Sequence, residues 1–443
     1  MVASALHVGQ LSQPAHLPVR KAMVVGIGNA LEFYDFLTFS YFAIQIGHVF
    51  FPESQTSHGL LYSLATFGLG FITRPLGGIV IGTYGDRVGR KAAMMVSFSL
   101  MGIAIVGLAL TPSFAQIGMA APILLLLFRL IQGFALGGEV GPSTAFLIEA
   151  APPRRRGLYL SLQYATQGLA IFTAGLVGFI LSSVLTPAAL ESWGWRLAFL
   201  LGAAVVPVGL YIRRNLPETL HDSTPVDSAL GGSTASATSP TRPRVALSVL
   251  LLGLLMLGSN TTATYVLNYM NTYAQDTLKL GTHLAFVATI VMGFCYTVAS
   301  PVGGVLSDRL GAKRVLLFAQ GALLVMVLPS FIILTHLGTY AALYTATAVL
   351  TLASQVSCVT VMVCIAGTLP KAVRSGAIST IYAVAVALFG GSAQFIVKWL
   401  IDVTQSPLAP AWYLSGALII GGVAMLAFPT PANPTSAATT SSR

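Results

Sequence analysis

Ionisable side chains interrupt stretches of this 443-residue chain that are otherwise apolar: Glu32, Asp35, Arg74, Arg129 and Glu139. A charge within a membrane costs a few kcal/mol at least, so such a residue should face the protein interior and have a partner. A buried carboxyl group near an arginine can take up and release a proton when its surroundings change. An arginine stays charged and can hold a carboxylate through two parallel hydrogen bonds.

These charges suggest two roles. We expect Asp35, Glu139 and Glu32 to handle protons, and Arg74 and Arg129 to bind an anionic substrate. Counted at about 1.5 Å per residue, Asp35, Arg74 and Glu139 lie about 16 to 20 Å from the inner ends of their predicted helices. Arg129 lies further out by the same count. A permanent ion pair with a purely structural or conformational role is the alternative for each of these charges.

Uncharged polar residues recur at helical spacing and extend this set. Residues three or four apart share a helix face, and polar faces are costly against lipid, so such stripes should point inward. The longest stripe contains Thr261, Tyr265, Asn268 and Thr272, and Tyr269 and Tyr273 flank it. Polar packing between helices is the alternative explanation. The predicted substrate contacts, besides the two arginines, are Asn29, Gln163, Gln167, Tyr265, Asn268 and Tyr269.

The composition identifies the elements that must position these residues. Hydrophobic residues make up 55% of the chain, charged residues only 8%, and the mean hydropathy is +0.81. Soluble domains contain about 25% charged residues. Apolar runs of about 20 residues, long enough to cross a bilayer, recur along the chain. They predict an all-α polytopic membrane protein with helices near residues 23–48, 59–85, 91–111, 121–150, 157–184, 195–214, 245–274, 283–308, 313–335, 339–368, 372–402 and 409–429.

An internal repeat divides the predicted helices, about twelve in number, into two pseudo-symmetric halves of about six. GTYGDRVGRK precedes the third helix and GVLSDRLGAKR precedes the ninth. Repeated six-helix units with a site between them are typical of transporters. The Ser-, Thr- and Pro-rich segment 215–244 cannot support a core and is predicted to be a linker. We therefore expect a tail at 1–22, bundles at 23–214 and 245–430, and a disordered tail at 431–443.

The net charge of +10 reflects topology. Lysines and arginines cluster at alternate helix ends, as the positive-inside rule requires, which places both termini and the linker in the cytoplasm. Nucleic acid is therefore not an expected partner. Cys295, Cys358 and Cys364 lie in apolar segments without disulfide or metal spacing. No P-loop or catalytic triad is present, so we expect neither a cofactor nor an enzyme.

Several motifs resemble a known family. The loop GDRVGRK is similar to the signature loop of the major facilitator superfamily. GNALEFYDF, FITRPLGG, RLIQGFALGGEVG, WGWR and FGG resemble its metabolite:proton symporter family. QIGMAAPILLLLFRLIQGF, ESWGWRLAFLLG and FGGSAQFIVKWLI are most similar to the citrate and tricarballylate branch. The resemblance covers about residues 22–430.

The resemblance implies a charged latch that holds the cytoplasmic side shut in the outward-facing state. Fixing topology and capping helices is the alternative role for its members. Lys398 and Asp402, four residues apart, predict a snorkelling lysine with an intrahelical partner. The gating candidates are Asp86, Arg87, Arg90, Glu149, Arg156, Asp308, Arg309 and Arg374.

The resemblance also implies a function. We expect proton-coupled symport of a tri- or dicarboxylate such as citrate, by alternating access, in a bacterial inner membrane and as a monomer. Sodium is the alternative driving ion. A zwitterion or osmolyte symporter with a tyrosine cage is a further candidate. A drug efflux protein is a further alternative, but it would need fewer fixed charges in its cavity. A sensor that does not transport would have lost its gating loops, whereas both Asp-Arg loops are intact in this sequence.

Overall fold

The computed structural model describes residues 30, 33–52, 58–88, 90–137, 144, 147–148, 151–152, 154–214, 246–370 and 373–429. All regular structure in these residues is helical. The sites predicted at Asn29, Glu32, Glu139 and Glu149 lie outside the described residues. The predicted tails 1–22 and 431–443 and the linker 215–244 do so as well.

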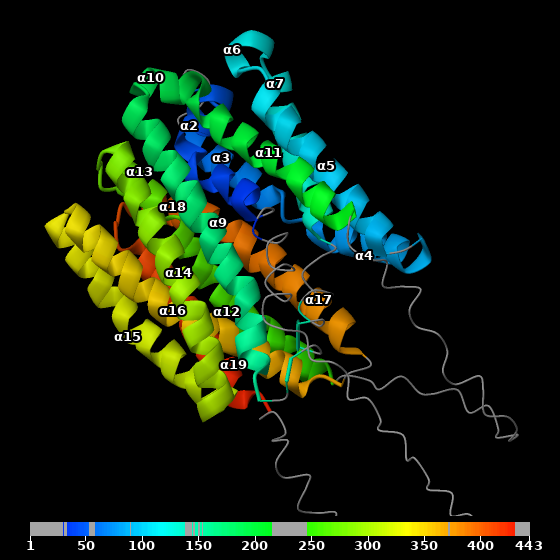
Figure 1. Ribbon diagram of the computed structural model, residues 1–443. Helices are drawn as coiled ribbons and strands as arrows, with labels where there is room; N and C mark the ends of the chain where they lie inside the picture. Colours follow the sequence, from blue (N-terminus) through cyan, green and yellow to red (C-terminus); the bar gives the residue numbers. More distant parts are fainter. Residues whose placement is uncertain are drawn as a thin grey trace, which may run out of the picture.

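We call residues 30–214 the N-terminal half. The chain is helical over residues 33–41 and continues into α2. The remaining elements of this half are short connecting helices and longer membrane helices (Figure 1). They are α2 (Ala43–Phe50), α3 (Gly59–Leu69), α4 (Arg74–Val88), α5 (Arg90–Leu110), α6 (Phe114–Ile117), α7 (Ala120–Leu136), α9 (Arg156–Val184), α10 (Pro187–Ala189), the π-helix η1 (Leu190–Gly194) and α11 (Trp195–Arg214).

We call residues 246–429 the C-terminal half. Its helices are longer and continue with few interruptions. They are α12 (Leu247–Asn268), α13 (Met270–Asp276), α14 (Thr282–Leu310), α15 (Ala312–Leu337), α16 (Tyr340–Thr368), α17 (Arg374–Ala385), the π-helix η4 (Val386–Gly390), α18 (Gly391–Thr404) and α19 (Ala409–Ala427).

These helices confirm the predicted all-α polytopic fold. Within the described residues, 8 helices are long and apolar enough to cross a membrane, and Met95–Leu110 and Ala120–Leu136 are shorter apolar helices. The predicted continuous helices contain breaks. A turn at 70–73 separates α3 from α4, and α12 ends just before Tyr269. Periodicity cannot locate such breaks, because the apolar pattern continues through them.

Glycines hold α4 against α7 in backbone contact. A Cβ on Gly77 would lie 1.8 Å from the Phe134 carbonyl oxygen, and one on Gly133 would lie 1.6 Å from the Gly70 carbonyl oxygen. Small residues permit such close approach between membrane helices. Glycines of the FITRPLGG and RLIQGFALGG motifs therefore allow these helices to pack closely. This packing brings Arg74 near the face of α7.

Other motif residues provide hydrogen bonds or turns at the ends of helices. Arg196, from the WGWR motif, donates to the carbonyl oxygens of Ala109 (2.8 Å) and Thr111 (2.7 Å). These carbonyls lie at and just beyond the C-terminus of α5, where backbone acceptors lack intrahelical donors. Gly311, with φ of 90°, makes the turn between α14 and α15 that follows the second Asp-Arg pair.

The two halves meet along α9 and α14, which lie side by side (Figure 1). The contact is close because both helices present glycines to it. A Cβ on Gly293 would lie 2.2 Å from the Phe172 backbone nitrogen, and one on Gly168 would lie 2.5 Å from that of Thr297. The candidate site lies beside this seam.

Candidate functional site

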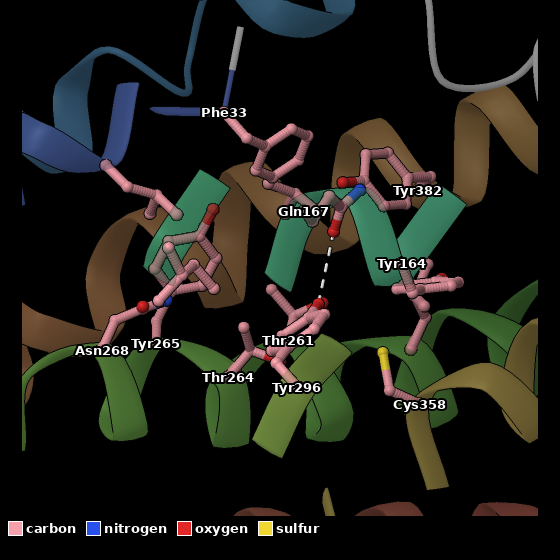
Figure 2. Close-up of a pocket in the computed structure, with 14 residues that line it drawn as sticks. Phe33, Tyr164, Gln167, Thr261, Thr264, Tyr265, Asn268, Tyr296, Cys358 and Tyr382 are labelled. Atoms are coloured by element: carbon pink, nitrogen blue, oxygen red, sulfur yellow. Dashed lines mark hydrogen bonds between the residues drawn. The ribbon is translucent and has the colours of Figure 1, made fainter. Parts of the chain in front are cut away.

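A cavity lies between the halves. Its walls come from residues 33–41 and α9 of the N-terminal half and from α12, α14, α16, α17 and η4 of the C-terminal half. Figure 2 shows its side chains converging from these helices. The cavity is lined by Phe33, Leu37, Tyr164, Gln167, Ile171, Leu257, Thr261, Thr264, Tyr265, Asn268, Tyr296, Cys358, Tyr382 and Val386.

The described lining carries hydrogen-bonding groups and no charge. Four tyrosines supply phenol hydroxyls, and a hydrogen bond crosses the seam where the Tyr296 hydroxyl donates to Gln167 Oε1 at 3.3 Å (Figure 2). Cys358 lies beside Tyr164 at one end of the cavity. Such walls can orient a small polar molecule but cannot by themselves neutralise an anion.

The structure places some of the predicted substrate contacts in this lining and others elsewhere. Gln167, Tyr265 and Asn268 line the cavity. Gln163 instead accepts a hydrogen bond from Thr144 at 3.1 Å and is outside the lining. Tyr269 is buried, and its hydroxyl has no hydrogen-bond partner among the described residues. Each position on a helix turns the side chain by about 100°, so neighbours in sequence face different surroundings.

Sequence reasoning missed several lining residues. Tyr164 lies three residues before Gln167 and shares its face, so the helical spacing could have identified it. Tyr296, Cys358 and Tyr382 lie in helices that carry other polar residues, such as Ser300 and Gln355, and nothing in the sequence distinguishes them from these neighbours. Only the packing of α14, α16 and α17 brings them together.

A buried charged cluster lies next to the cavity. Gln132 on α7 donates from Nε2 to Asp35 Oδ2 at 2.8 Å and accepts at Oε1 from Arg129 Nη1 at 2.7 Å. All three side chains are at most 1% exposed. Asp35 Oδ1 and two of the Arg129 nitrogens, Nε and Nη2, have no hydrogen-bond partner among the described residues. The Gln132 side-chain amide thus bridges Asp35 and Arg129. Both of these residues keep hydrogen-bonding atoms that have no partner among the described residues.

Counting residues places Arg129 further out than Asp35, yet the ends of the two side chains share one hydrogen-bonding partner. Gln132 connects the two side chains directly. Counting along a helix gives height only for a helix parallel to the membrane normal, whereas tilted helices bring different counted depths to one level.

Aromatic rings surround both arginines. The Arg74 guanidinium lies 4.3 Å from the centroid of Phe36 and 4.3 Å from that of Phe71. The Arg129 guanidinium lies 4.2 Å from the same Phe36 centroid and 4.5 Å from that of Phe39. Both cations therefore share one ring, whose negative π-face attracts them.

Arg74 joins this cluster to the cavity. Its guanidinium interacts electrostatically with Tyr265 and Tyr382, which both line the cavity. Arg74 is 5% exposed, and no ion pair connects it to an acid among the described residues. A buried cation without an acidic partner among the described residues thus lies directly behind the cavity wall.

Hydrogen bonds join the halves at the end of the cavity nearer α2. Tyr41 donates to Asn268 Oδ1 at 2.5 Å, and Asn271 donates to the Tyr41 carbonyl oxygen at 3.0 Å. Ser40 donates to Gln394 Oε1 at 2.8 Å. The first helix is thereby attached to α12, α13 and α18.

A second connection lies at the predicted cytoplasmic end. Asp308 accepts from the backbone nitrogens of Gly157 (2.8 Å) and Leu158 (3.0 Å), in the first turn of α9. A carboxylate is stabilised there by free N–H groups and the helix dipole. This acid belongs to the second Asp-Arg loop, and its bonds link the C-terminal half to the N-terminal half.

The other gating candidates are less connected in the described structure. Arg87 and Arg309 are exposed. Arg374 is buried and donates to the Leu369 carbonyl oxygen at 3.1 Å, and Arg156 begins α9. Asp86 and Arg90 lie at helix ends, but their side chains are outside the described structure.

Lys398 has the predicted intrahelical partner and a second one. Its ammonium lies 2.8 Å from Asp402 Oδ1 and 2.8 Å from Asp276 Oδ2 on α13. The second bond was not predicted, because Asp276 is distant in sequence. The two acids neutralise this lysine.

Comparison with known proteins identifies the family. The model of the Major Facilitator Superfamily matches residues 32–392. The chain is 34% identical to a citrate-proton symporter of Klebsiella pneumoniae, with 89% of this chain and 88% of the relative covered.

Other relatives and solved structures agree on the family. An alpha-ketoglutarate permease of Escherichia coli is 33% identical, with 88% of each chain covered. A proline/betaine transporter of Escherichia coli is 31% identical, with 91% of this chain and 82% of the relative covered. The crystal structure of a D-xylose-proton symporter aligns with a TM-score of 0.74 at 17% identity, covering 93% of this chain and 98% of that one. The chain therefore belongs to the major facilitator superfamily and is a multi-pass membrane transporter rather than an enzyme.

Proposed function

We propose that this protein is a proton-coupled symporter of an organic acid, a tri- or dicarboxylate such as citrate. The observation that carries the proposal is Arg74, a buried guanidinium without an acidic partner in the described structure that interacts with two tyrosines of the cavity wall. An unpaired buried charge is costly, and a substrate carboxylate would compensate it. Arg129 is partly engaged through Gln132, so we assign Arg74 the main contact with the substrate.

The cavity lining supports a substrate with several polar groups. Gln167, Tyr265 and Asn268 can donate hydrogen bonds to carboxylate or hydroxyl oxygens, and Tyr164, Tyr296 and Tyr382 add further phenols. Hydrogen bonds from fixed donors orient a ligand and reject analogues that leave them unpaired. The matched relatives include proteins named for citrate and for alpha-ketoglutarate, both carboxylates.

Asp35 is the proposed proton carrier. It is 1% exposed, has one unpartnered oxygen, and lies one amide away from Arg129. An acid in such surroundings changes its protonation state when the neighbouring charge changes. Relatives named as proton symporters favour protons over sodium as the driving ion.

For the transport cycle we propose alternating access. The bundles 23–214 and 245–430 would rock about the cavity, breaking the Tyr41–Asn268 bonds at one end and the Asp308 bonds at the other in turn. Arg156 and Arg374, and the first Asp-Arg loop, would contribute to the second closure. The working unit would be a monomer in a bacterial inner membrane, with both termini in the cytoplasm.

A second candidate is a zwitterion such as betaine. The cavity is walled by Phe33, Tyr164, Tyr265, Tyr296 and Tyr382, and aromatic faces bind quaternary ammonium groups. A betaine would place its single carboxylate toward Arg74 and its cation among these rings. The proline/betaine transporters among the relatives agree with this candidate.

Counterflow in proteoliposomes distinguishes the two candidates. Vesicles preloaded with citrate, tricarballylate, ketoglutarate or betaine would be assayed for uptake of the same labelled compound. We expect exchange of at least one carboxylate and little exchange of betaine. Exchange of betaine alone would reject the organic-acid proposal in favour of the zwitterion.

A further inference from the structure

The ring shared by the two arginines suggests how substrate and proton are linked. We propose that Phe36 is a positioning residue that couples substrate binding at Arg74 to protonation of Asp35, an inference that rests on the proposed function. Of the rings that contact these guanidinium groups in the described structure, Phe36 is the one that contacts both. It is fully buried.

The geometry keeps two like charges close in a space without water. Both guanidinium groups lie within 4.3 Å of the Phe36 centroid. Two cations this near each other repel, and the repulsion is strong where the dielectric constant is low. The ring offers a negative π-face to both guanidinium groups and fills space in which water would otherwise screen their charges. The charge of Arg74 therefore acts on Arg129, which in turn acts on Asp35.

Within the described residues, few groups act on Asp35. On α7 it faces Arg129 and Gln132, and on its own helix it adjoins Tyr34. From α11 it is approached by Gly202, which carries no side chain. Arg74 acts on Arg129 from α4. The described positive charges around this acid are thus the two arginines joined through Phe36.

The sign of the coupling follows from these charges. Before substrate binds, the positive charges of Arg129, beside Asp35, and of Arg74, on the shared ring, oppose protonation of this acid. A substrate carboxylate on Arg74 cancels one of them, so a proton on Asp35 becomes more favourable. By reciprocity, a protonated Asp35 leaves uncompensated positive charge and strengthens binding of the anion. Substrate and proton therefore bind together, as symport requires.

Neighbouring rings provide matched controls. Phe71 contacts Arg74 but not Arg129, and Phe39 contacts Arg129 but not Arg74. Replacing either one by leucine removes a cation–π contact of the same kind and similar length, while the shared ring remains. Phe36→Leu and the volume-matched Phe36→Met remove the shared ring, and Phe36→Tyr retains it.

The test is calorimetric titration of the purified full-length protein with citrate, in buffers of different protonation enthalpy. It yields the number of protons taken up per citrate bound and the Kd at about pH 6 and about pH 8. Protons carried by citrate itself contribute equally to every variant. We expect Phe36→Leu and Phe36→Met to reduce the number of protons taken up per citrate. The ratio of the Kd values at the two pH values should become smaller by about five- to tenfold. Phe36→Tyr, Phe39→Leu and Phe71→Leu should retain the wild-type coupling.

Several results would overturn the inference. One is wild-type proton uptake in a folded Phe36→Leu or Phe36→Met protein. Another is an equal loss in the Phe39→Leu and Phe71→Leu controls, which would show a general packing effect. Either result would leave citrate binding, and with it the proposed function, intact. A wild-type protein that binds no carboxylate would instead reject the proposed function itself.

Discussion

The two halves of the molecule differ in how they use polar residues. In the N-terminal half, buried charges gather in one cluster of Asp35, Arg74 and Arg129, enclosed by aromatic rings. In the C-terminal half, the described cavity lining consists of uncharged groups such as Tyr265 and Tyr382. The membrane charge of that half, Lys398, is already neutralised by two acids.

This difference suggests a division of labour. A buried charge is the group whose state depends most on neighbouring charges, so the N-terminal cluster is suited to sensing anion and proton. Hydroxyl and amide groups keep their state and depend on geometry, so the C-terminal wall is suited to recognising shape. The cavity lies where the two meet, and each half can be tested by its own substitutions.

The largest effect should come from Asp35, the proposed proton carrier. We expect Asp35→Asn to reduce uptake driven by a pH gradient by about 100-fold, because the amide cannot take up the proton that couples the two fluxes. Labelled-citrate accumulation in proteoliposomes measures this. Counterflow, which needs no gradient, should survive in the same preparation. Undiminished accumulation would remove Asp35 from the coupling site.

Substitutions of Arg74 should have the second-largest effect. Arg74→Ala removes a charged hydrogen-bond donor from behind the cavity wall and should weaken citrate binding by about 30-fold. Arg74→Lys keeps the charge but loses the bidentate geometry, so it should recover only part of the affinity. Equilibrium binding of labelled citrate gives both values. Normal affinity in Arg74→Ala would show that the cation is structural.

Single hydroxyl deletions in the C-terminal wall should have smaller effects. Tyr265→Phe and Tyr382→Phe each remove one neutral hydrogen-bond donor and should raise the KM for uptake by about fivefold. Proton uptake per citrate should stay at the wild-type value, because these phenols keep their protons. A change in that stoichiometry would contradict the proposed division between the halves.

Substitution of Lys398 should have the smallest effect on uptake. Lys398→Met leaves Asp276 and Asp402 without their partner and should lower the free energy of unfolding by about 1 kcal/mol. Uptake should remain within about twofold of wild type, because Lys398 and its two acidic partners lie outside the lining of the cavity between the halves. Thermal unfolding and initial uptake rates test this. A large loss of uptake without loss of stability would assign Lys398 to the substrate pathway.

Part of the site was predictable because burial of polar groups in a membrane is rare. Arg74, Arg129 and Asp35 are conspicuous in apolar helices, and the stripe on the seventh predicted helix identified Tyr265 and Asn268. Tyr296, Cys358 and Tyr382 were not predictable, since nothing in the sequence distinguishes them from other polar residues on the same helices. The proposed role of Phe36 was equally hidden, because phenylalanine is ordinary in such helices.

The helical membrane fold, the repeat and the buried charges could be predicted from the amino-acid sequence alone. The cost of placing polar and charged groups in lipid leaves these features few alternatives. Which charges meet became evident only from the packing of the helices. Glycine contacts set how closely α4 and α7 approach. Distances between side chains on different helices depend on packing, and no periodicity within one helix contains that information.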